Sequence, residues 1–248
     1  MTDTFVIFNA DDFGASVGVN WGIVDSHVGG VVTSASLMVT GRAVHEAVAL
    51  SRDHPGLAVG LHFDVWGEDE REFDITDRRA LREEFRWQVD RFFALTGRLP
   101  THVDSHRHAH LKAGNLALFQ ELVEPLGVPL RGDGKVRYVS HFYAQWEWMV
   151  TDLDHVSVAA LEQYLREQVR PGWQELSCHP GYPSPDYQAV YLAERPVEVA
   201  TLTDPAIGRT IEELGYRLAS YADYPSTHEA EAGSAPQAGP TPPRVDRR

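Results

Sequence analysis

The stretch from Thr101 to His110 gathers side chains that could carry metal chemistry. It reads Thr-His-Val-Asp-Ser-His-Arg-His-Ala-His, so four of the twelve histidines and one aspartate fall within nine residues. Imidazole and carboxylate groups are ligands that divalent transition metals commonly use in proteins. The first hypothesis is therefore a metal site.

Strand geometry limits how many of these residues can bind one ion. If the apolar residues leading into the stretch form a strand, its period of two places Asp104, His106, His108 and His110 on one side. A strand advances by about 3.3 Å per residue, so the four side chains cannot all contact a single ion. We expect one direct ligand, while the others orient it, bind substrate or fill space.

Two carboxylates follow the first apolar run of the chain. Phe5–Phe8 has the pattern of a buried strand and leads into Asp11, Asp12 and Gly14. Adjacent side chains leave a strand on opposite faces, but a turn that ends at Gly14 could bring both aspartates to one site. One would then ligate a cation while the other accepts a proton from bound water. The alternative is that both are loop or helix-capping residues.

Histidines stand at the ends of two further apolar runs. His62 lies in the run Leu57–Phe63, where a lone histidine is more often a hydrogen-bonded core residue than a ligand. His179 precedes Pro-Gly, which stops the strand, and its imidazole could act as a general acid near neutral pH. Its neighbour Cys178 is expected to be a small buried apolar residue rather than a nucleophile.

Composition restricts the class of protein. The 248 residues are 43% hydrophobic, which allows a sizeable core, and 36 acidic against 22 basic residues give a net charge of -14. No basic stripe could follow a phosphate backbone, so nucleic acid is not expected as a partner. The single cysteine excludes an intrachain disulfide and a cysteine-rich zinc site. No apolar run reaches the roughly 18 residues of a membrane helix, and the N-terminus lacks signal-peptide character, so we expect a cytoplasmic protein without a membrane partner.

Strand-like runs alternate with helical patterns along most of the chain, which is typical of βα units around a parallel sheet. The clearest helix is expected over 77–96, where an i, i+4, i+8 apolar stripe ends at Gly97. A second is expected over 113–126, and Thr203-Asp204-Pro205 indicates the start of a third. Strands are expected near residues 5–9, 31–38, 57–64, 101–105, 128–131, 173–178 and 216–221.

Seven such units predict a single α/β domain over residues 1–224, with a (β/α) barrel of about seven parallel strands. The candidate side chains all lie where strands end, which is the catalytic face of parallel α/β folds. Residues 133–156 are rich in aromatic side chains and form either a wall of a substrate pocket or an excursion packed on the barrel surface. Residues 225–248 are rich in Pro, Ala, Gly and Glu, so we expect a disordered C-terminal tail.

Taken together, these motifs resemble those of the YdjC-like carbohydrate deacetylases, a family that includes the bacterial chitooligosaccharide deacetylases. The resemblance implies a distorted TIM-like barrel that binds one divalent cation through an aspartate and two histidines. The likeness extends from about Phe5 to Tyr224. The motifs that carry it are Asn9–Gly14, Gly60–His62, His102–His110 and Cys178–Pro180.

Carried over residue by residue, the resemblance implies the metal ligands Asp12, His62 and His106, with Asp11 as the catalytic base and His179 as the acid. The ion would be Zn2+ or Mg2+, because an Asp-His-His set suits zinc whereas the family is associated with magnesium. The reaction implied is removal of an N-acetyl group from an amino sugar or a short N-acetylated oligosaccharide, with release of acetate. Arg131, Arg195 and Glu198 fall where family members carry like residues, so the resemblance implies that they contact substrate or tune the site. It leaves open a homodimer and the roles of Asp104, His108 and His110.

The chain is shorter between His62 and His102 than the chitooligosaccharide enzymes, so a loop that shapes the substrate site is reduced and the sugar is not identified.

Two other functions fit the same residues. A metal-dependent phosphoesterase or amidohydrolase is the first alternative, because histidine-rich strand ends also build those sites. A non-catalytic carbohydrate-binding barrel is the second.

Overall fold

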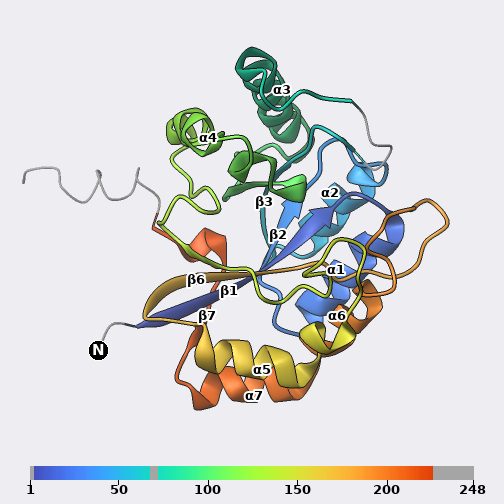
Figure 1. The fold of residues 1–248 in the computed structure, drawn as a ribbon, viewed down its shortest axis with the longest axis vertical. Coiled ribbons are helices and arrows are strands. Elements are labelled where there is room, and N and C mark those ends of the chain that lie inside the picture. The colour runs from blue at the N-terminus through green and yellow to red at the C-terminus, as the bar shows by residue number, and fades with distance from the viewer. Residues whose placement is uncertain (1–2, 68–71, 226–248) are drawn as a thin grey trace, which may run out of the picture.

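Strand β1 (Thr4–Phe13) lies at the centre of a seven-stranded sheet in which every strand pairing is parallel. In this computed structural model, which describes residues 3–67 and 72–225, the strand order is β4-β3-β2-β1-β6-β5, and β7 also pairs with β1. The sheet curls into part of a barrel (Figure 1). The other strands are β2 (Ser34–Leu37), β3 (Ala58–Phe63), β4 (Val103–Ser105), β5 (Arg137–Val139), β6 (Gly172–Cys178) and β7 (Arg217–Leu218).

Helices cover the outer face of the curled sheet, and Figure 1 shows α5 and α7 side by side next to β1, β6 and β7. This arrangement confirms the predicted α/β barrel architecture. Among the described residues, no helix is both long and apolar enough to cross a membrane. The helices are α1 (Val17–Val28), α2 (Val44–Asp53), α3 (Arg78–Thr96), α4 (Leu116–Val123), α5 (Val158–Glu167), α6 (Arg195–Leu202) and α7 (Pro205–Glu213).

The two faces of β1 differ in polarity. Val6 and Phe8 belong to the large apolar core that the strands share with the helices. Ile7 belongs instead to a small separate cluster, and Asn9 and Asp11 hydrogen-bond to side chains of other strands and loops. Because alternate residues of a strand face opposite sides, the main hydrophobic core lies outside the sheet and the inside of the barrel is largely polar.

Helix α3 follows directly from its sequence. Asp77 caps its N-terminus, because its side chain accepts hydrogen bonds from the backbone N–H groups of Arg79 and Ala80. The buried apolar face includes Leu81 and Phe85, as the stripe predicted. Gly97 ends the helix with φ of 75°, a left-handed conformation that glycine adopts without strain. The predicted helix over 77–96 is confirmed.

Three predicted elements differ from the structure. The strand expected over 216–221 is reduced to the two residues of β7. The strand expected over 128–131 is reduced to an isolated bridge between Leu130 and Val103. At the opposite end of the sheet, β5 pairs with β6, and its three residues are too few to give a periodic signal in the sequence. Helix α4 ends early, because the turn around Pro125 tightens into a 3-10 helix at 124–126. Residues 226–248 of the predicted tail lie outside the described residues.

Gly60 of β3 stands where a side chain would meet a buried histidine ring. A Cβ there would lie 2.4 Å from two atoms of the His102 ring, which is itself stacked on Tyr221 with centroids 3.8 Å apart. We expect Gly60→Ala to lower the free energy of unfolding by about 1–3 kcal/mol, because the buried ring has no free space to move into. Urea denaturation measures the effect.

Gly208 on α7 provides the matched control for this substitution. Nothing lies within 4 Å of the position that a Cβ would take there. Gly208→Ala should therefore raise the free energy of unfolding by about 0.5–1 kcal/mol through the higher helix propensity of alanine. Equal free energies of unfolding in Gly60→Ala and Gly208→Ala would contradict a tight contact between Gly60 and the His102 ring.

Candidate active site

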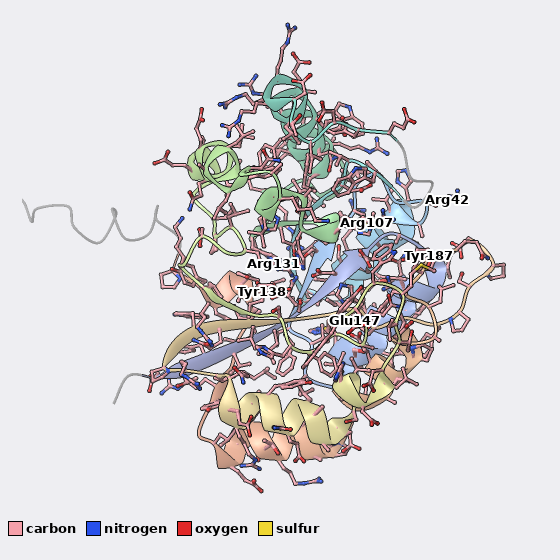
Figure 2. The ribbon with its side chains drawn as sticks, viewed as in Figure 1. Arg42, Arg107, Arg131, Tyr138, Glu147 and Tyr187 are labelled. Atoms are coloured by element: carbon pink, nitrogen blue, oxygen red, sulfur yellow. The ribbon has the colours of Figure 1, made fainter. Side chains whose placement is uncertain are left out.

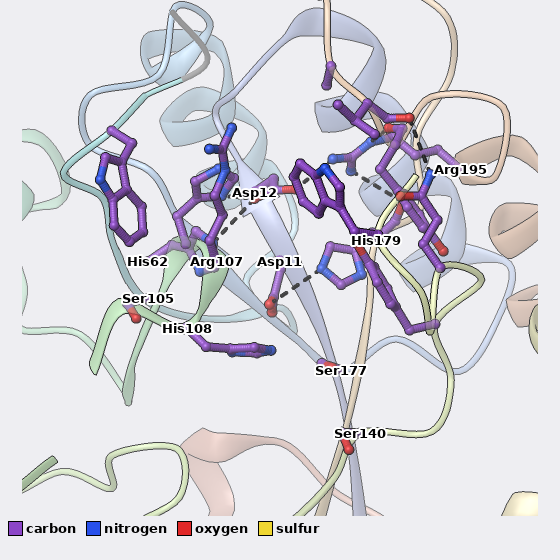
Figure 3. Close-up of a pocket in the computed structure, with 18 of the residues that line it drawn as sticks. Asp11, Asp12, His62, Ser105, Arg107, His108, Ser140, Ser177, His179 and Arg195 are labelled. Atoms are coloured by element: carbon purple, nitrogen blue, oxygen red, sulfur yellow. Dashed lines mark hydrogen bonds and ion pairs between the residues drawn. The ribbon is translucent and has the colours of Figure 1, made fainter. Parts of the chain in front are cut away.

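The two adjacent aspartates at the end of β1 face the same pocket. Asp11 still follows the strand alternation and points to the inside of the barrel. Asp12 has φ of 69°, in the left-handed region that aspartate tolerates better than most residues. This single backbone change lets the second carboxylate line the same pocket as the first (Figure 3). The convergence predicted for the turn before Gly14 is therefore present.

Asp12 lies between two histidines that come from different strands. Its Oδ1 atom is 3.2 Å from Nε2 of His62 in β3 and 3.1 Å from Nδ1 of His106, which directly follows β4. Asp12 and His62 are buried, and the side chain of His106 is 12% exposed. One carboxylate and two imidazoles converging at this distance form a donor set that fits a divalent metal ion.

The second oxygen of Asp12 is held by an arginine. Nη2 of Arg195 donates a hydrogen bond of 2.6 Å to Oδ2, which leaves Oδ1 for the histidines. Burial would raise the pKa of Asp12, but the charge of Arg195 and hydrogen bonds from His106 and His62 hold it well below its usual value. Asp12 is therefore ionised, as a metal ligand must be.

His62 is oriented by Asp104 of the neighbouring strand β4. Their register pairs the two residues directly, and Nδ1 of His62 lies 2.7 Å from Oδ1 of Asp104. This contact turns Nε2 toward Asp12. A carboxylate behind a histidine in this way is the usual outer support of a metal-ligating imidazole.

Arg131 is the buried cation that links the carboxylates inside the barrel. Its guanidinium donates two hydrogen bonds of 2.7 Å to Asp11, and Nη2 also lies 2.8 Å from Oδ2 of Asp104. Figure 2 shows Arg131 beside Tyr138, whose ring packs against the guanidinium. Burial would raise the pKa of Asp11, but the charge and hydrogen bonds of Arg131, together with the charge of His62, lower it below its usual value.

The position of Arg131 also bears on how many ions the site can hold. Asp11, His62 and Asp104 form a second group whose donor atoms lie close enough to ligate a metal. The guanidinium already bonds to both of its carboxylates. A second cation here would meet like charge, so the arrangement favours a single ion at Asp12, His62 and His106.

His179 faces Asp11 across the pocket. It follows the last residue of β6, and its Nε2 atom lies 3.7 Å from Oδ2 of Asp11 (Figure 3). Burial lowers the pKa of His179 to about 4, although the charges of Asp11 and Asp12 oppose that shift. The imidazole is therefore neutral at pH 7. The neighbouring Cys178 is fully buried and its thiol pKa is raised by burial, as expected for an unreactive cysteine.

The five predicted site residues all line one pocket of about 730 Å³. Several side chains of the segment 133–156 form one wall of it, so the segment is not merely a surface excursion. Six aromatic rings line this pocket, and their faces suit the apolar faces of sugar rings. The aromatic lining residues are Trp66, Tyr138, Tyr143, Trp148, Tyr187 and Tyr191.

The remaining histidines of the 101–110 stretch have separate surroundings. The strand ends at Ser105, and positive φ angles at Arg107 and His108 break the expected alternation. His108 lines the pocket, whereas His110 contacts Ser105 and the carbonyl of Arg131 away from it. Only His106 of this stretch joins Asp12 and His62.

One supporting residue was missed by sequence reasoning. Glu175 of β6 is fully buried and accepts hydrogen bonds from Arg131 and from the Tyr221 hydroxyl. It contributes a third carboxylate to the surroundings of Arg131. The available signal was a glutamate within the apolar run 173–178, where an unpaired charge would be costly.

Comparison with known proteins identifies the family. The model of the YdjC-like protein family matches residues 5–213. The chain belongs to the YdjC-like family. A chitooligosaccharide deacetylase of Enterobacter sp. (strain 638) is 33% identical, and the match covers 89% of this chain and 99% of that relative. A chitooligosaccharide deacetylase of Serratia marcescens is 32% identical, with the same coverage. The resemblance inferred from the motifs is therefore confirmed.

Solved structures support the fold of this YdjC-like chain. A structure from Enterococcus faecalis V583, provisionally named a cellobiose-phosphate cleavage protein, superposes with a TM-score of 0.75 at 25% identity, covering 89% of this chain and 98% of that one. A polysaccharide deacetylase of Bacillus cereus gives a TM-score of 0.58 at 15% identity, covering 89% of this chain and 93% of that one. At that identity the second likeness shows the fold alone.

The contact between His62 and Asp104 yields a prediction about metal affinity. Asp104→Asn keeps the shape of the side chain but removes its charge, so it should weaken Zn2+ binding by about 10- to 100-fold. Competition with a chromogenic chelator measures this directly. Asp133→Asn is the control, because Asp133 binds only its own loop and Lys135. Equal affinities in the two variants would mean that Asp104 does not support the ligand.

Proposed function

We propose that this YdjC-like protein is a metal-dependent hydrolase that removes the acetyl group from an N-acetylated amino sugar or short oligosaccharide and releases acetate. The observation that carries the proposal is the arrangement of two carboxylates with different partners. Asp12 converges with His62 and His106, while both oxygens of Asp11 accept hydrogen bonds from Arg131. One carboxylate is thus available to a metal and the other to a proton.

The substrate class is supported by the relatives and by the pocket. Two relatives that match nearly their full length are named chitooligosaccharide deacetylases, and their names point to amide-linked acetyl groups on sugars. The aromatic wall of the pocket offers stacking surfaces for sugar rings. The two alternatives, a phosphoesterase or amidohydrolase and a non-catalytic binding barrel, make distinct predictions in the assay below.

Asp12, His62 and His106 would hold one divalent ion. Zn2+ fits the donor set better than Mg2+, because two of three ligands are imidazoles and magnesium prefers oxygen. When bound, the ion would polarise the acetamide carbonyl and lower the pKa of water. Arg195 keeps Asp12 ionised for this purpose, and Asp104 orients His62.

The protein groups account for the proton transfers. Asp11, ionised through its contact with Arg131, takes a proton from the attacking water. The C–N bond breaks as the amine leaves, and His179 protonates its nitrogen. Because His179 is neutral before the reaction, the proton that it delivers must reach it during turnover. Asp11 lies 3.7 Å away and has just gained one, so we assign Asp11 as its source.

The assay that tests the reaction compares products. Protein stripped with a chelator and reloaded with Zn2+ or Mg2+ is incubated with N-acetylglucosamine, its β-1,4-linked disaccharide and a sugar phosphate. We expect acetate from at least one N-acetylated sugar and none without metal. Phosphate release would favour the phosphoesterase, and sugar binding without acetate would favour the binding barrel. If phosphate release or sugar binding were observed and no acetate were released, the deacetylase proposal would be wrong.

Substitution of Asp11 tests the assigned base. Asp11→Asn should lower kcat by about 10²- to 10⁴-fold, the usual contribution of a general base, while the protein still binds metal. His62→Ala is the contrasting variant, since it should lose the metal itself. Metal content by mass spectrometry and kcat by acetate release separate the two effects. Near-native turnover in Asp11→Asn with metal bound would remove Asp11 from the mechanism.

A further inference from the structure

The start of helix α6 holds both backbone polar groups of His179. The N–H of His179 donates to Oε2 of Glu198 at 2.5 Å, and its carbonyl accepts from Nη1 of Arg195 at 3.3 Å. Arg195 and Glu198 are three residues apart, so they lie on the same face of the helix. Both backbone polar groups of His179, the proposed acid, are therefore hydrogen-bonded to side chains of one helix, α6.

Arg195 also reaches the opposite side of the pocket. Its Nη2 atom donates to Oδ2 of Asp12 at 2.6 Å and to the hydroxyl of Tyr187 at 2.8 Å. A single guanidinium therefore connects the backbone of His179 to the carboxylate of Asp12. The planar, forked geometry of arginine allows these bonds at the same time, which a lysine ammonium on a flexible stem cannot reproduce.

Glu198 extends the attachment to the aromatic wall. The Tyr191 hydroxyl donates to its Oε1 atom and accepts from the backbone N–H of Ala144 at 3.1 Å. The Tyr191 ring stacks on Tyr143 with centroids 4.7 Å apart, and both rings lie within 5.5 Å of the His179 ring. Movement of Glu198 would therefore disturb the surroundings of His179 as well as its backbone.

Burial of these two charged groups is costly for the fold. Arg195 is 3% exposed and Glu198 is fully buried. Burial raises the pKa of Glu198 to about 7, although the hydrogen bonds from Tyr191 and His179 lower it. Apolar side chains could anchor a helix against a strand without such desolvation. Stability alone therefore does not require polar groups at these two positions.

We infer that Arg195 and Glu198 form one positioning unit that fixes His179 relative to Asp12. The inference rests on the proposed function, because it takes His179 as the acid and Asp12 as a metal ligand. Neither residue has to contact substrate. Glu198 acts through His179, and Arg195 acts through both His179 and Asp12.

A double-mutant cycle tests the action of Glu198 through His179. Glu198→Ala should lower kcat at least tenfold with little change in KM, because the acid is misplaced while substrate binding remains. In the His179→Ala background the same substitution should change kcat less than twofold, since the group that it positions is already gone. Additive losses would overturn the inference. Glu198→Gln keeps the shape of the side chain and should lower kcat less than Glu198→Ala does. If the alanine variant does not fold, Glu198→Gln replaces it in the double-mutant cycle.

Metal affinity tests the action of Arg195 without any need for turnover. Arg195→Lys retains the charge but loses the fork, and it should weaken Zn2+ binding about tenfold in chelator competition. Arg209→Lys on the exposed face of α7 is the matched control and should not change the affinity. Glu198→Gln should leave it unchanged too. If Arg195→Lys bound Zn2+ as tightly as the wild-type protein does, the inferred action of Arg195 through Asp12 would be wrong.

The double-mutant cycle and the chelator competition together separate failure of the inference from failure of the proposed function. If wild-type protein releases no acetate, the deacetylase proposal is wrong, and the chelator competition still decides whether Arg195 supports the metal ligand. If wild-type protein releases acetate but the losses in the cycle are additive, only the positioning unit is wrong.

Discussion

A buried guanidinium is the interaction on which this site depends. Arg131 lies among Asp11, Asp104 and Glu175 inside the barrel, with hydrogen bonds to Asp11 and Glu175 and a close contact to Asp104. Without a cation, carboxylates this close together could not all ionise. Removing one partner of such a buried pair typically costs about 3–5 kcal/mol, because the remaining charges are left uncompensated. The ionised state of Asp11 and the orientation of His62 through Asp104 both follow from this one charge.

The parallel sheet explains why residues far apart in sequence meet around that charge. Asp12, His62, His106 and His179 each stand at the carboxyl end of a strand or just beyond it, and parallel strands place these ends along one edge. The helices contribute differently. Arg195 and Glu198, in the first turn of helix α6, hydrogen-bond to Asp12 and to the backbone of His179. This turn therefore supports the site as well as the packing of the helix.

Much of this arrangement could be predicted from sequence, and the exceptions have a common cause. Asp11, Asp12, His62 and His179 stand at the ends of apolar runs, which sequence patterns reveal, and the family resemblance selected His106 from its neighbours. The left-handed turn at Asp12, the three-residue strand β5 and the pairing of Arg131 with Glu175 depend on contacts between distant segments. Local periodicity contains no information about such contacts. The helix over 78–96 was predictable because its cap, apolar stripe and terminal glycine are all local.

The separation between a polar barrel interior and an apolar outer core has an evolutionary consequence. The large hydrophobic core is shared between the outer face of the sheet and the helices, and part of the pocket wall belongs to it: Tyr187 is a member of this core and Tyr143 packs against it, whereas Trp148 lies outside it. Trp148, which is 70% exposed, can therefore change without dismantling the scaffold, whereas a change at Tyr187 or Tyr143 would also disturb core packing. A lineage built on this fold can vary the exposed rim of the pocket freely, while the buried part of the wall and the buried charges are constrained together, because Tyr187 and Tyr191 hydrogen-bond to Arg195 and Glu198.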